Sequence, residues 1–292
     1  MRRGGGSGAP GAAVAAGVLA CGLAACGGSE STLSACGTPD PADSYTLGDE
    51  AMGCVGSADA THADVYSFIG PATASGADTQ IQIDNAAGTV RATVYGADNT
   101  AMATFTAASP GAALVFHLAA GPGASYRLAV DDGGGFASPY SYRLTSTFTA
   151  IPDNFEPNDS PEKAMPIPMA TPVDAFLFAG ASTSMPADAI ATFDDYYQVM
   201  ITETQTATVR IDNVPTDLAA RLFLYRSDLT ELARIATGHR GEALVMATPL
   251  PLDPGTYLVR VAPWAEVPTG VSAGAQAPDH FTRGYQLTVT QP

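Results

Sequence analysis

The chain has 292 residues and is strongly acidic, because 29 Asp and Glu residues outnumber 13 Lys and Arg residues and give a formal net charge of −16 at pH 7. This balance excludes nucleic-acid binding, which depends on basic patches that displace counterions from phosphates. An anionic membrane surface is a poor electrostatic partner for the same reason, so any membrane attachment has to come from another source.

The N-terminal segment is predicted to be a signal peptide over residues 1–25. Two arginines precede an apolar stretch over residues 12–25, which is too short to span a bilayer as a permanent helix. The stretch ends in Leu23-Ala24-Ala25-Cys26-Gly27, which resembles the bacterial lipobox, the motif in which the cysteine is acylated and becomes the first mature residue. We therefore expect an exported lipoprotein whose contact with the membrane is a lipid anchor on Cys26.

The same region leaves alternatives open. An ordinary cleaved signal would make the cysteine incidental. Val18-Leu19-Ala20-Cys21 matches the lipobox less well, and Leu33-Ser34-Ala35-Cys36 matches it but lies beyond the apolar run. Gly27 stands where an Asp typically retains lipoproteins in the inner membrane, so in a Gram-negative cell envelope we expect the outer membrane.

Two cysteines, Cys36 and Cys54, remain after signal cleavage and acylation. Exported compartments are oxidising, so we expect a disulfide between them, with two free thiols as the alternative. The bond would close a loop near the start of the first domain and contribute about 3 kcal/mol by the chain-entropy relation. Neither cysteine has a further Cys or His at zinc-finger spacing. Residues 26–38 are interpreted as a linker.

The rest of the chain predicts an all-β fold that occurs twice. Short alternating runs of Val, Ile, Leu, Thr and Tyr are separated by Gly, Pro, Asn and Asp, which is typical of sandwiches and barrels. The segment Ile81-Gln82-Ile83-Asp84-Asn85 returns as Val209-Arg210-Ile211-Asp212-Asn213. We predict two tandem β-sandwich domains over residues 39–149 and 150–292, the second preceded by a proline-rich linker, and each long enough for its own core.

Matching segments follow the same order in both copies. Each copy is expected to open with a turn, to continue with a strand led by Asp, and to end with two strands after a glycine turn. The pairs are the turns 40–44 and 156–160, the Asp-led strands 64–68 and 195–199, the closing strands 123–130 and 255–261, and the last strands 142–147 and 285–290. Residues 267–280, rich in Gly, Ala and Pro, are expected to form a mobile insertion.

Four short motifs of the second copy carry a resemblance to a known family. They are Glu156-Pro157-Asn158-Asp159-Ser160, Asp195-x-Tyr197, Leu252-Asp253-Pro254-Gly255-Thr256-Tyr257 and Tyr285-x-Leu287-x-Val289. In this order they resemble the bacterial pre-peptidase C-terminal (PPC) domain, a small β-sandwich appended to many secreted proteases and surface proteins. The first copy is a weaker match, with Asp40-Pro41-Ala42-Asp43 at the opening position. The resemblance implies jelly-roll-like sandwiches that bind, assist secretion or shield partners without catalysing a reaction.

Some relatives of this domain bind calcium, and the resemblance carries their ligands onto this chain. Calcium takes hard oxygen ligands and tolerates irregular geometry. The alternative is that these residues form Asx turns without metal. Asn154 stands where the relatives carry a further acid, and Ala42 replaces the Asn in copy one. The candidates are Glu156, Asn158, Asp159 and Asp195, with Asp194 as an additional one, in copy two, and Asp40, Asp43, Asp59 and Asp64 in copy one.

No catalytic residues are expected, because the required spacings are missing. The four histidines fall in separate segments, without the spacing of a zinc hydrolase, and no Gly-x-Ser-x-Gly elbow occurs. Asp194 and Asp195 are the one pair of acids to weigh as a glycosidase pair. Adjacent strand residues point to opposite faces, however, so turn or metal roles are favoured.

Trp264, the only tryptophan, follows the closing strand of copy two and is a candidate to stack on a sugar or anchor an interface. Packing over the sandwich edge is the alternative. Together these features predict a non-catalytic surface lipoprotein with two binding or structural modules, stabilised by calcium, whose partner is an extracellular protein or polysaccharide. A secretion or assembly accessory for a separately encoded exported protease and a divergent carbohydrate-active enzyme are the alternatives.

Overall fold

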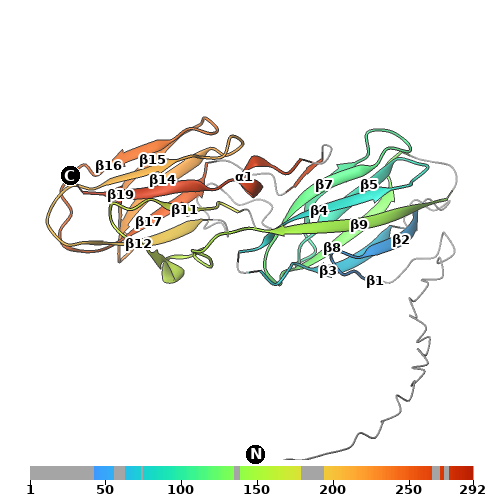
Figure 1. The fold of residues 1–292 in the computed structure, drawn as a ribbon, viewed down its shortest axis with the longest axis horizontal. Coiled ribbons are helices and arrows are strands. Elements are labelled where there is room, and N and C mark those ends of the chain that lie inside the picture. Colours follow the sequence, from blue (N-terminus) through green and yellow to red (C-terminus); the bar gives the residue numbers. More distant parts are fainter. Residues whose placement is uncertain are drawn as a thin grey trace, which may run out of the picture. The chain divides into compact units, whose positions relative to one another are not determined.

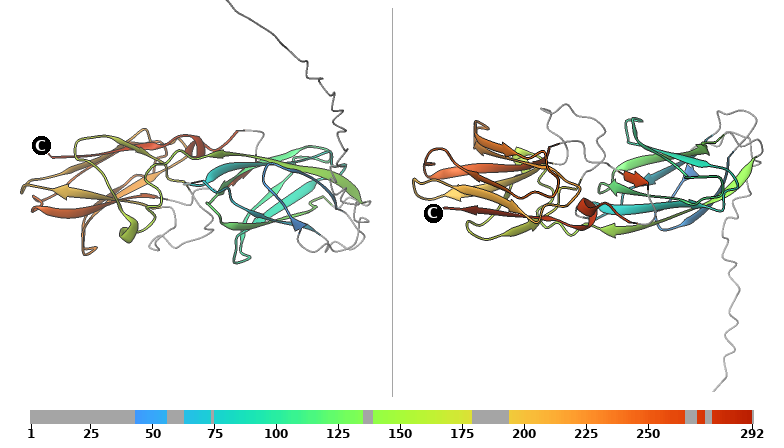
Figure 2. Two further views of the ribbon diagram at one scale, coloured as in Figure 1. Left: turned by 60° about the horizontal axis from the view of Figure 1, so that its bottom comes forward. Right: turned by 90° about the horizontal axis from the view of Figure 1, so that it is seen from above.

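The computed structural model describes residues 43–55, 63–73, 75–134, 139–178, 194–264, 270–272 and 276–291. These residues form two β-sandwiches, each made of two facing sheets (Figure 1, Figure 2). The predicted all-β fold with two tandem sandwiches is therefore confirmed. Within the described part of the chain, no helix is long and apolar enough to cross a membrane.

The first sandwich contains nine strands in two sheets. One sheet has the order β1-β3-β8-β5-β6, and the other has β2-β9-β4-β7 with the later strand β18 added at the edge. The parallel pair β1 and β3 is the exception to antiparallel pairing here. The strands are β1 (Asp43–Ser44), β2 (Glu50–Val55), β3 (Asp64–Ile69), β4 (Ala77–Asp84), β5 (Val90–Tyr95), β6 (Ala101–Thr106), β7 (Leu114–Ala120), β8 (Ser125–Asp132) and β9 (Tyr140–Ala150).

The second sandwich repeats this topology strand for strand. Its sheets have the orders β10-β12-β17-β14-β15 and β11-β19-β13-β16, again with one parallel pair, β10 and β12. The elements are the 3-10 turn η1 (Pro161–Lys163), β10 (Met165–Pro166), β11 (Val173–Ala175), β12 (Asp195–Ile201), β13 (Thr208–Asp212), β14 (Ala220–Arg226), β15 (Glu231–Ala236), β16 (Leu244–Ala247), β17 (Gly255–Pro263), β18 (Gly270–Ser272), the short helix α1 (Asp279–Thr282) and β19 (Tyr285–Thr290).

Alternation of apolar and polar residues explains why these segments are strands. In β8, for example, Tyr126, Leu128 and Val130 are buried while the residues between them are more exposed. The repeated Ile-Asp-Asn motif marks the end of a strand in each copy. Asn85 and Asn213 have φ angles of 59° and 55°, in the left-handed region that Asn tolerates better than most residues. The motif therefore encodes a turn after β4 and after β13.

Strand register corrects one part of the sequence alignment. The Cα of Asp43 lies opposite Tyr66 in the first sandwich, and that of Met165 lies opposite Tyr197 in the second. Asp43 therefore corresponds to Met165 rather than to a residue of the 156–160 turn. The equivalence of the turns 40–44 and 156–160 was wrong, because a short motif containing Asp and Pro matched by composition without sharing a strand partner.

Each sandwich encloses its own apolar core, and a smaller third cluster joins Ala119, Ile151, Phe178 and Phe281. The segment over residues 267–280 was expected to be a mobile insertion. Its Gly270–Ser272 part pairs with β7 as strand β18, and α1 begins near its end. The composition rich in Gly and Ala did not reveal this pairing, since three residues are too few to show an alternating pattern.

Candidate functional site

Asp195 lies at the centre of the candidate site in the second sandwich. It is the first residue of β12 and is 2% exposed. Tyr285, at the start of β19, donates a hydrogen bond to the Asp195 carboxylate. The Tyr197 hydroxyl lies 3.3 Å from the same carboxylate oxygen and 2.6 Å from the Tyr285 hydroxyl. Asp195 and Tyr197 point to the same side because alternate strand residues share a face.

Burial dominates the electrostatics of Asp195 and raises its pKa well above the ordinary value. The hydrogen bond from Tyr285 opposes this rise, whereas the nearby Asp153 and Glu156 carboxylates add to it. An ionised carboxylate that is shielded from water needs a compensating partner. The site therefore favours a proton or a cation beside Asp195.

Asn158, from the predicted opening turn, is completely buried beside this aspartate strand. Its backbone carbonyl accepts a hydrogen bond from the Tyr196 N–H at 2.9 Å, which ties the turn to β12. Neither polar atom of its side-chain amide has a hydrogen-bond partner. Burial raises the pKa of the Tyr197 hydroxyl, and the Asn158 amide opposes that rise, so the two groups are close without making a hydrogen bond of normal geometry. A buried amide in this state calls for a ligand or a water.

Glu156 brings a half-buried carboxylate to the turn. Its Oε2 atom accepts the Asn158 N–H at 3.0 Å. Burial, followed by the charge of Asp159, raises the pKa of Glu156 to about 7. Asp159 is more exposed and lies 3.6 Å from the Lys163 ammonium. Acidic groups are thus crowded around Asn158, where a single lysine offsets their charge incompletely.

Asp153 is a further member that the sequence did not single out. It is 3% exposed, and its two carboxylate oxygens accept the backbone N–H groups of Phe155 and Phe176 at 2.8 and 2.7 Å. Burial raises its pKa, and these two hydrogen bonds oppose the rise. The neighbouring Asn154, which stands where the resembling calcium-binding domains carry an acid, is exposed. The buried acid is Asp153, one residue earlier. The sequence Asp153-Asn154 does not show by itself which of the two side chains is buried.

Asp194 does not join this group. Although it is 1% exposed, it forms an ion pair with Arg260 of β17. Burial raises the pKa of Asp194 to about 6, against the opposing charge of Arg260. Asp194 directly precedes β12, and its partner Arg260 lies opposite Tyr196, whose side chain points away from the face of Asp195. Asp194 therefore balances an arginine, and the two acids do not face each other as a glycosidase pair would.

The donor chemistry of the remaining candidates fits calcium. Calcium prefers oxygen ligands, and these are offered by Glu156, Asn158, Asp159 and Asp195. The side-chain oxygen of Asn158 has no hydrogen-bond partner, so it is available as a ligand. These side chains do not yet surround a metal position, however. Among the described residues, no group of three or more His, Cys, Asp or Glu side chains is already placed to hold a metal ion. Binding would therefore require the opening turn to draw closer to Asp195.

The first sandwich builds a related site with a different neighbour. Tyr142 donates its hydroxyl to Asp64 at 2.8 Å and lies 2.9 Å from the Tyr66 hydroxyl. The Asp64 carboxylate also accepts the backbone N–H of Cys54 at 2.7 Å. Of the other copy-one candidates, Asp43 is exposed on the edge strand β1, and Asp40 and Asp59 lie outside the described residues.

The cysteine predictions fall largely outside the described residues. Cys54 lies in β2 and is disulfide-bonded. Cys36 and the lipidation candidate Cys26 are not among the described residues, so the pairing of Cys36 with Cys54 and the anchor on Cys26 stay predictions.

Trp264 lies directly after the last strand residue of β17 and is 50% exposed. Its backbone N–H donates to the Ala219 carbonyl at 2.8 Å, and the Arg221 guanidinium lies 5.6 Å from the centre of its ring. The indole is therefore held beside a cation at the end of the central strand β17, with half of its surface open. This position is compatible with both the ligand contact and the edge packing foreseen for it.

The chain matches no protein-family model and no curated protein sequence. Among solved structures, it is similar to the pre-peptidase C-terminal domain of collagenase from Bacillus anthracis, with 20% identity, 38% of this chain and 98% of that chain covered, and a TM-score of 0.29. It is also similar to the CBM22-1-CBM22-2 tandem domain of Paenibacillus barcinonensis Xyn10C (10% identity, 84% and 92% covered, TM-score 0.26). A protein from Eubacterium rectale, predicted to be secreted, is similar at 10% identity (82% and 72% covered, TM-score 0.24). None of these values decides the family or the function.

Proposed function

We propose that this protein is an exported, lipid-anchored, non-catalytic protein of the cell envelope. Its two β-sandwiches act as binding or structural modules, and calcium stabilises the second one. The observation that carries the calcium part is the Asn158 amide, which is fully buried without a hydrogen-bond partner. It lies among the carboxylates of Glu156 and Asp195, whose pKa values are raised chiefly by burial.

Glu156, Asn158, Asp159 and Asp195 would hold the ion. Calcium bound there supplies positive charge to carboxylates that burial has separated from water. The Tyr285 hydroxyl orients the Asp195 carboxylate by its hydrogen bond. The Asn158 carbonyl bond to the Tyr196 N–H fixes the turn beside β12, so binding would fasten the start of the second sandwich to its sheet.

A binding role is favoured over catalysis by the way the candidate acids are arranged. Asp194 is committed to Arg260 on the opposite side of β12 from Asp195. Two of the four histidines, His117 and His280, are likewise engaged with the carboxylates of Asp78 and Asp217. These contacts supply no pair of opposed carboxylates of the kind that glycoside hydrolysis requires.

Thermal unfolding with excess calcium and then with EDTA tests the metal. A ligand at one hundred times its dissociation constant stabilises the folded state by about 2.7 kcal/mol, which should raise the midpoint by about 5 °C or more. Glu156→Gln should abolish that shift. In EDTA this variant should be at least as stable as the parent chain, because it removes a charge from a crowded acidic site.

Asp228→Asn is the matched control, because Asp228 is exposed in the turn between β14 and β15, away from the opening segment. It should keep the calcium shift. An equal midpoint in calcium and EDTA for the parent chain would show that the opening segment is a metal-free turn. The anchor is tested separately by Cys26→Ser, which should move the protein from the membrane fraction to the soluble exported fraction.

A further inference from the structure

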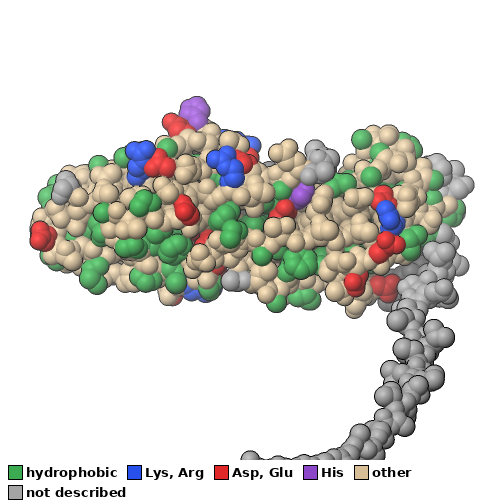
Figure 3. Space-filling model, in the orientation of Figure 1, with side chains coloured by type: hydrophobic (Ala, Val, Ile, Leu, Met, Phe, Trp, Pro, Cys, Tyr) green, Lys and Arg blue, Asp and Glu red, His purple; other side chains and the backbone are tan. Residues whose placement is uncertain are grey.

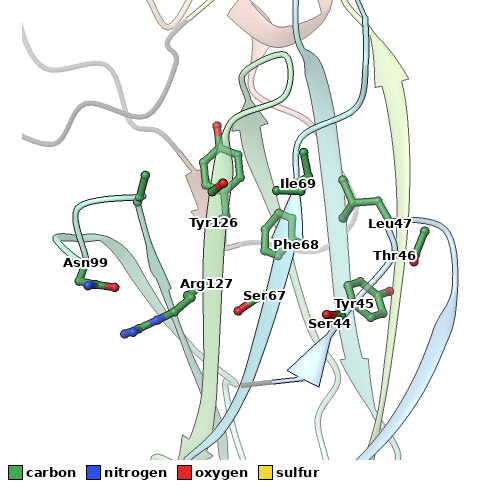
Figure 4. Close-up of a pocket in the computed structure, with 13 residues that line it drawn as sticks. Ser44, Tyr45, Thr46, Leu47, Ser67, Phe68, Ile69, Asn99, Tyr126 and Arg127 are labelled. Carbon is green, nitrogen blue, oxygen red and sulfur yellow. The ribbon is translucent and has the colours of Figure 1, made fainter. Parts of the chain in front are cut away.

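A pocket of about 540 Å³ lies on the first sandwich, at the end of the sheet formed by β1, β3, β8 and β5. This volume falls in the usual range for small-molecule sites. Ser67 and Ile69 of β3 and Arg127 of β8 line it from the sheet, and Asn99 lines it from the turn between β5 and β6 (Figure 4). Tyr66 and Leu128 point into the core, so their neighbours Ser67, Ile69 and Arg127 lie on the outer face of the sheet. The core residues Tyr45, Phe68 and Tyr126 also line the pocket, at the end of the sandwich.

Arg127 gives the pocket its charge. Its guanidinium lies 5.1 Å from the centre of the Tyr95 ring, and its Nε atom is shielded from solvent without a hydrogen-bond partner. Arg91 and Arg143 of the same sandwich pair with Asp131 and Asp84 at 2.7 and 2.9 Å. Arg127 makes no such ion pair with any carboxylate of the described residues. In a chain of net charge −16, a positioned arginine that lacks a carboxylate points to an anionic ligand.

The other lining groups fit a ligand that is rich in hydroxyl groups. Ser67 and Ser125 present hydroxyls, and Asn99 presents an exposed amide from a turn residue held at a φ angle of 62°. Ile69 is 57% exposed and adds an apolar surface. Short hydroxyl and amide side chains beside a small apolar surface suit the alternating hydroxyl and C–H faces of a sugar ring. A peptide added to a sheet would instead bind the backbone groups of a free strand edge, whereas the polar groups described here belong to side chains.

We propose that this pocket binds an acidic saccharide, with a sugar carboxylate on Arg127 and sugar hydroxyls on Ser67, Ser125 and Asn99. The proposal rests on the proposed function of the sandwiches as binding modules and names the ligand class of the first one. Arginine binds carboxylates in a bidentate manner, and the Tyr95 ring holds the guanidinium in place for that contact.

The second sandwich supplies a natural comparison. Arg127 lies opposite Tyr95, and Leu258 lies opposite Tyr225, so Leu258 takes the place of the arginine. Leu229, with a φ angle of 66°, likewise takes the place of Asn99. The equivalent surface in copy two therefore lacks the cationic side chain, and the acidic saccharide should bind the first sandwich alone.

Isothermal titration of the purified chain with trigalacturonate tests this proposal. The methyl-esterified trimer is the matched ligand without charge, and triglutamate is the matched carboxylate without sugar. We expect trigalacturonate to bind at least tenfold more tightly than either. Arg127→Leu, which installs the copy-two residue, should weaken binding at least tenfold, and Arg127→Lys should weaken it as well because lysine lacks the planar fork.

Arg226→Leu is the control for net charge, since it removes an exposed arginine of the second sandwich and should leave binding unchanged. Each variant has to keep the melting temperature of the parent chain. Absence of trigalacturonate binding, equal binding of triglutamate, or full binding by a folded Arg127→Leu variant would overturn the proposal. Titration in EDTA separates it from the proposed calcium site, because the Arg127 pocket contains no residue of the 156–160 turn and should bind equally well there.

Discussion

The two sandwiches share a buried Asp-Tyr-Tyr cluster, yet they surround its aspartate differently. In the first, the Asp64 carboxylate is partly exposed and accepts a backbone N–H from Cys54 as well as the Tyr142 hydroxyl. In the second, Asp195 is fully buried and is faced by Asp153 and Glu156. The strand topology and the tyrosines are the same, and the added acids of the second sandwich, Asp153 and Glu156, come from the segment before η1.

This difference separates two ways of keeping a carboxylate inside a sandwich. A backbone N–H donor stabilises Asp64 without changing the net charge of the site. Around Asp195, the added side chains are acidic, and they increase the need for a proton or a cation. If the proposed calcium site exists, the second sandwich should depend on a cation through these acids, which surround Asp195.

Removing Asp153 should have the largest effect on this comparison. Asp153→Ala leaves the backbone N–H groups of Phe155 and Phe176 without their acceptors, which should destabilise the second sandwich by about 3 to 4 kcal/mol. Denaturant unfolding followed by amide hydrogen exchange would assign the loss to that sandwich. Asn154→Ala, at the exposed neighbour, should change little. A loss below 1 kcal/mol would mean that water replaces the carboxylate.

The second effect tests how closely the backbone approaches the cluster. Gly53 lies opposite Tyr142, as Ala175 lies opposite Tyr285. A Cβ on Gly53 would lie 2.2 Å from the Tyr142 ring and 2.6 Å from the Asp64 carboxylate, so Gly53→Ala should destabilise the first sandwich by about 2 to 3 kcal/mol. Ala175→Gly is the reciprocal variant and should lose about 1 kcal/mol or less. Equal losses in urea unfolding would show that the two clusters are packed alike.

The tyrosine hydroxyls distinguish the two environments directly. Tyr285→Phe removes the donor to a fully buried carboxylate and should destabilise by about 2 kcal/mol, whereas Tyr142→Phe leaves Asp64 with the Cys54 N–H and should lose about 1 kcal/mol. Unfolding in EDTA makes the comparison, because a bound cation would mask the loss at Asp195. A larger loss for Tyr142→Phe than for Tyr285→Phe would mean that the Cys54 N–H does not compensate Asp64 for the lost tyrosine hydroxyl.

The sequence predicted the fold well and the site in part, for physical reasons that individual residues show. Val209 and Ile211 alternate with polar neighbours, so the pleat could be inferred. Asp195 and Tyr197 were found through a short motif on one strand. Asp153 was missed because its partners are the backbone N–H groups of Phe155 and Phe176, which any sequence supplies. Arg127 was missed because its role depends on a strand register that places it near the ring of Tyr95.

The pairing of surface charges also could not be predicted from the sequence. On the face drawn in Figure 3, basic side chains lie beside acidic ones rather than in one patch. Several arginines of the described residues form ion pairs, as Arg91 does with Asp131. Net charge indicated the excess of acids, but it could not show that Arg127 forms no ion pair with the described carboxylates. That information exists only in the fold, where strand neighbours decide which charges meet.

The smallest effect concerns a His-Asp contact in each sandwich. His280 Nδ1 lies 2.7 Å from Asp217, and His117 Nδ1 lies 2.8 Å from Asp78. Burial alone would raise the pKa of Asp217, but the hydrogen bond and charge of His280 outweigh it and lower the pKa. A carboxylate whose pKa is lowered by folding contributes stability above its unfolded pKa of 3.8, and that contribution is lost as the pH falls through the folded value.

Asp217→Asn should therefore destabilise by about 1 kcal/mol at pH 7. The difference from the parent chain should persist down to about pH 5 and shrink below about pH 4, where the parent loses the same charge. Urea midpoints at pH 7, 5 and 3 measure this, with Asp78→Asn as the matched variant in the first sandwich. A difference that stays constant to pH 3 would show that Asp217 acts as a hydrogen-bond acceptor for the His280 backbone, independently of its charge.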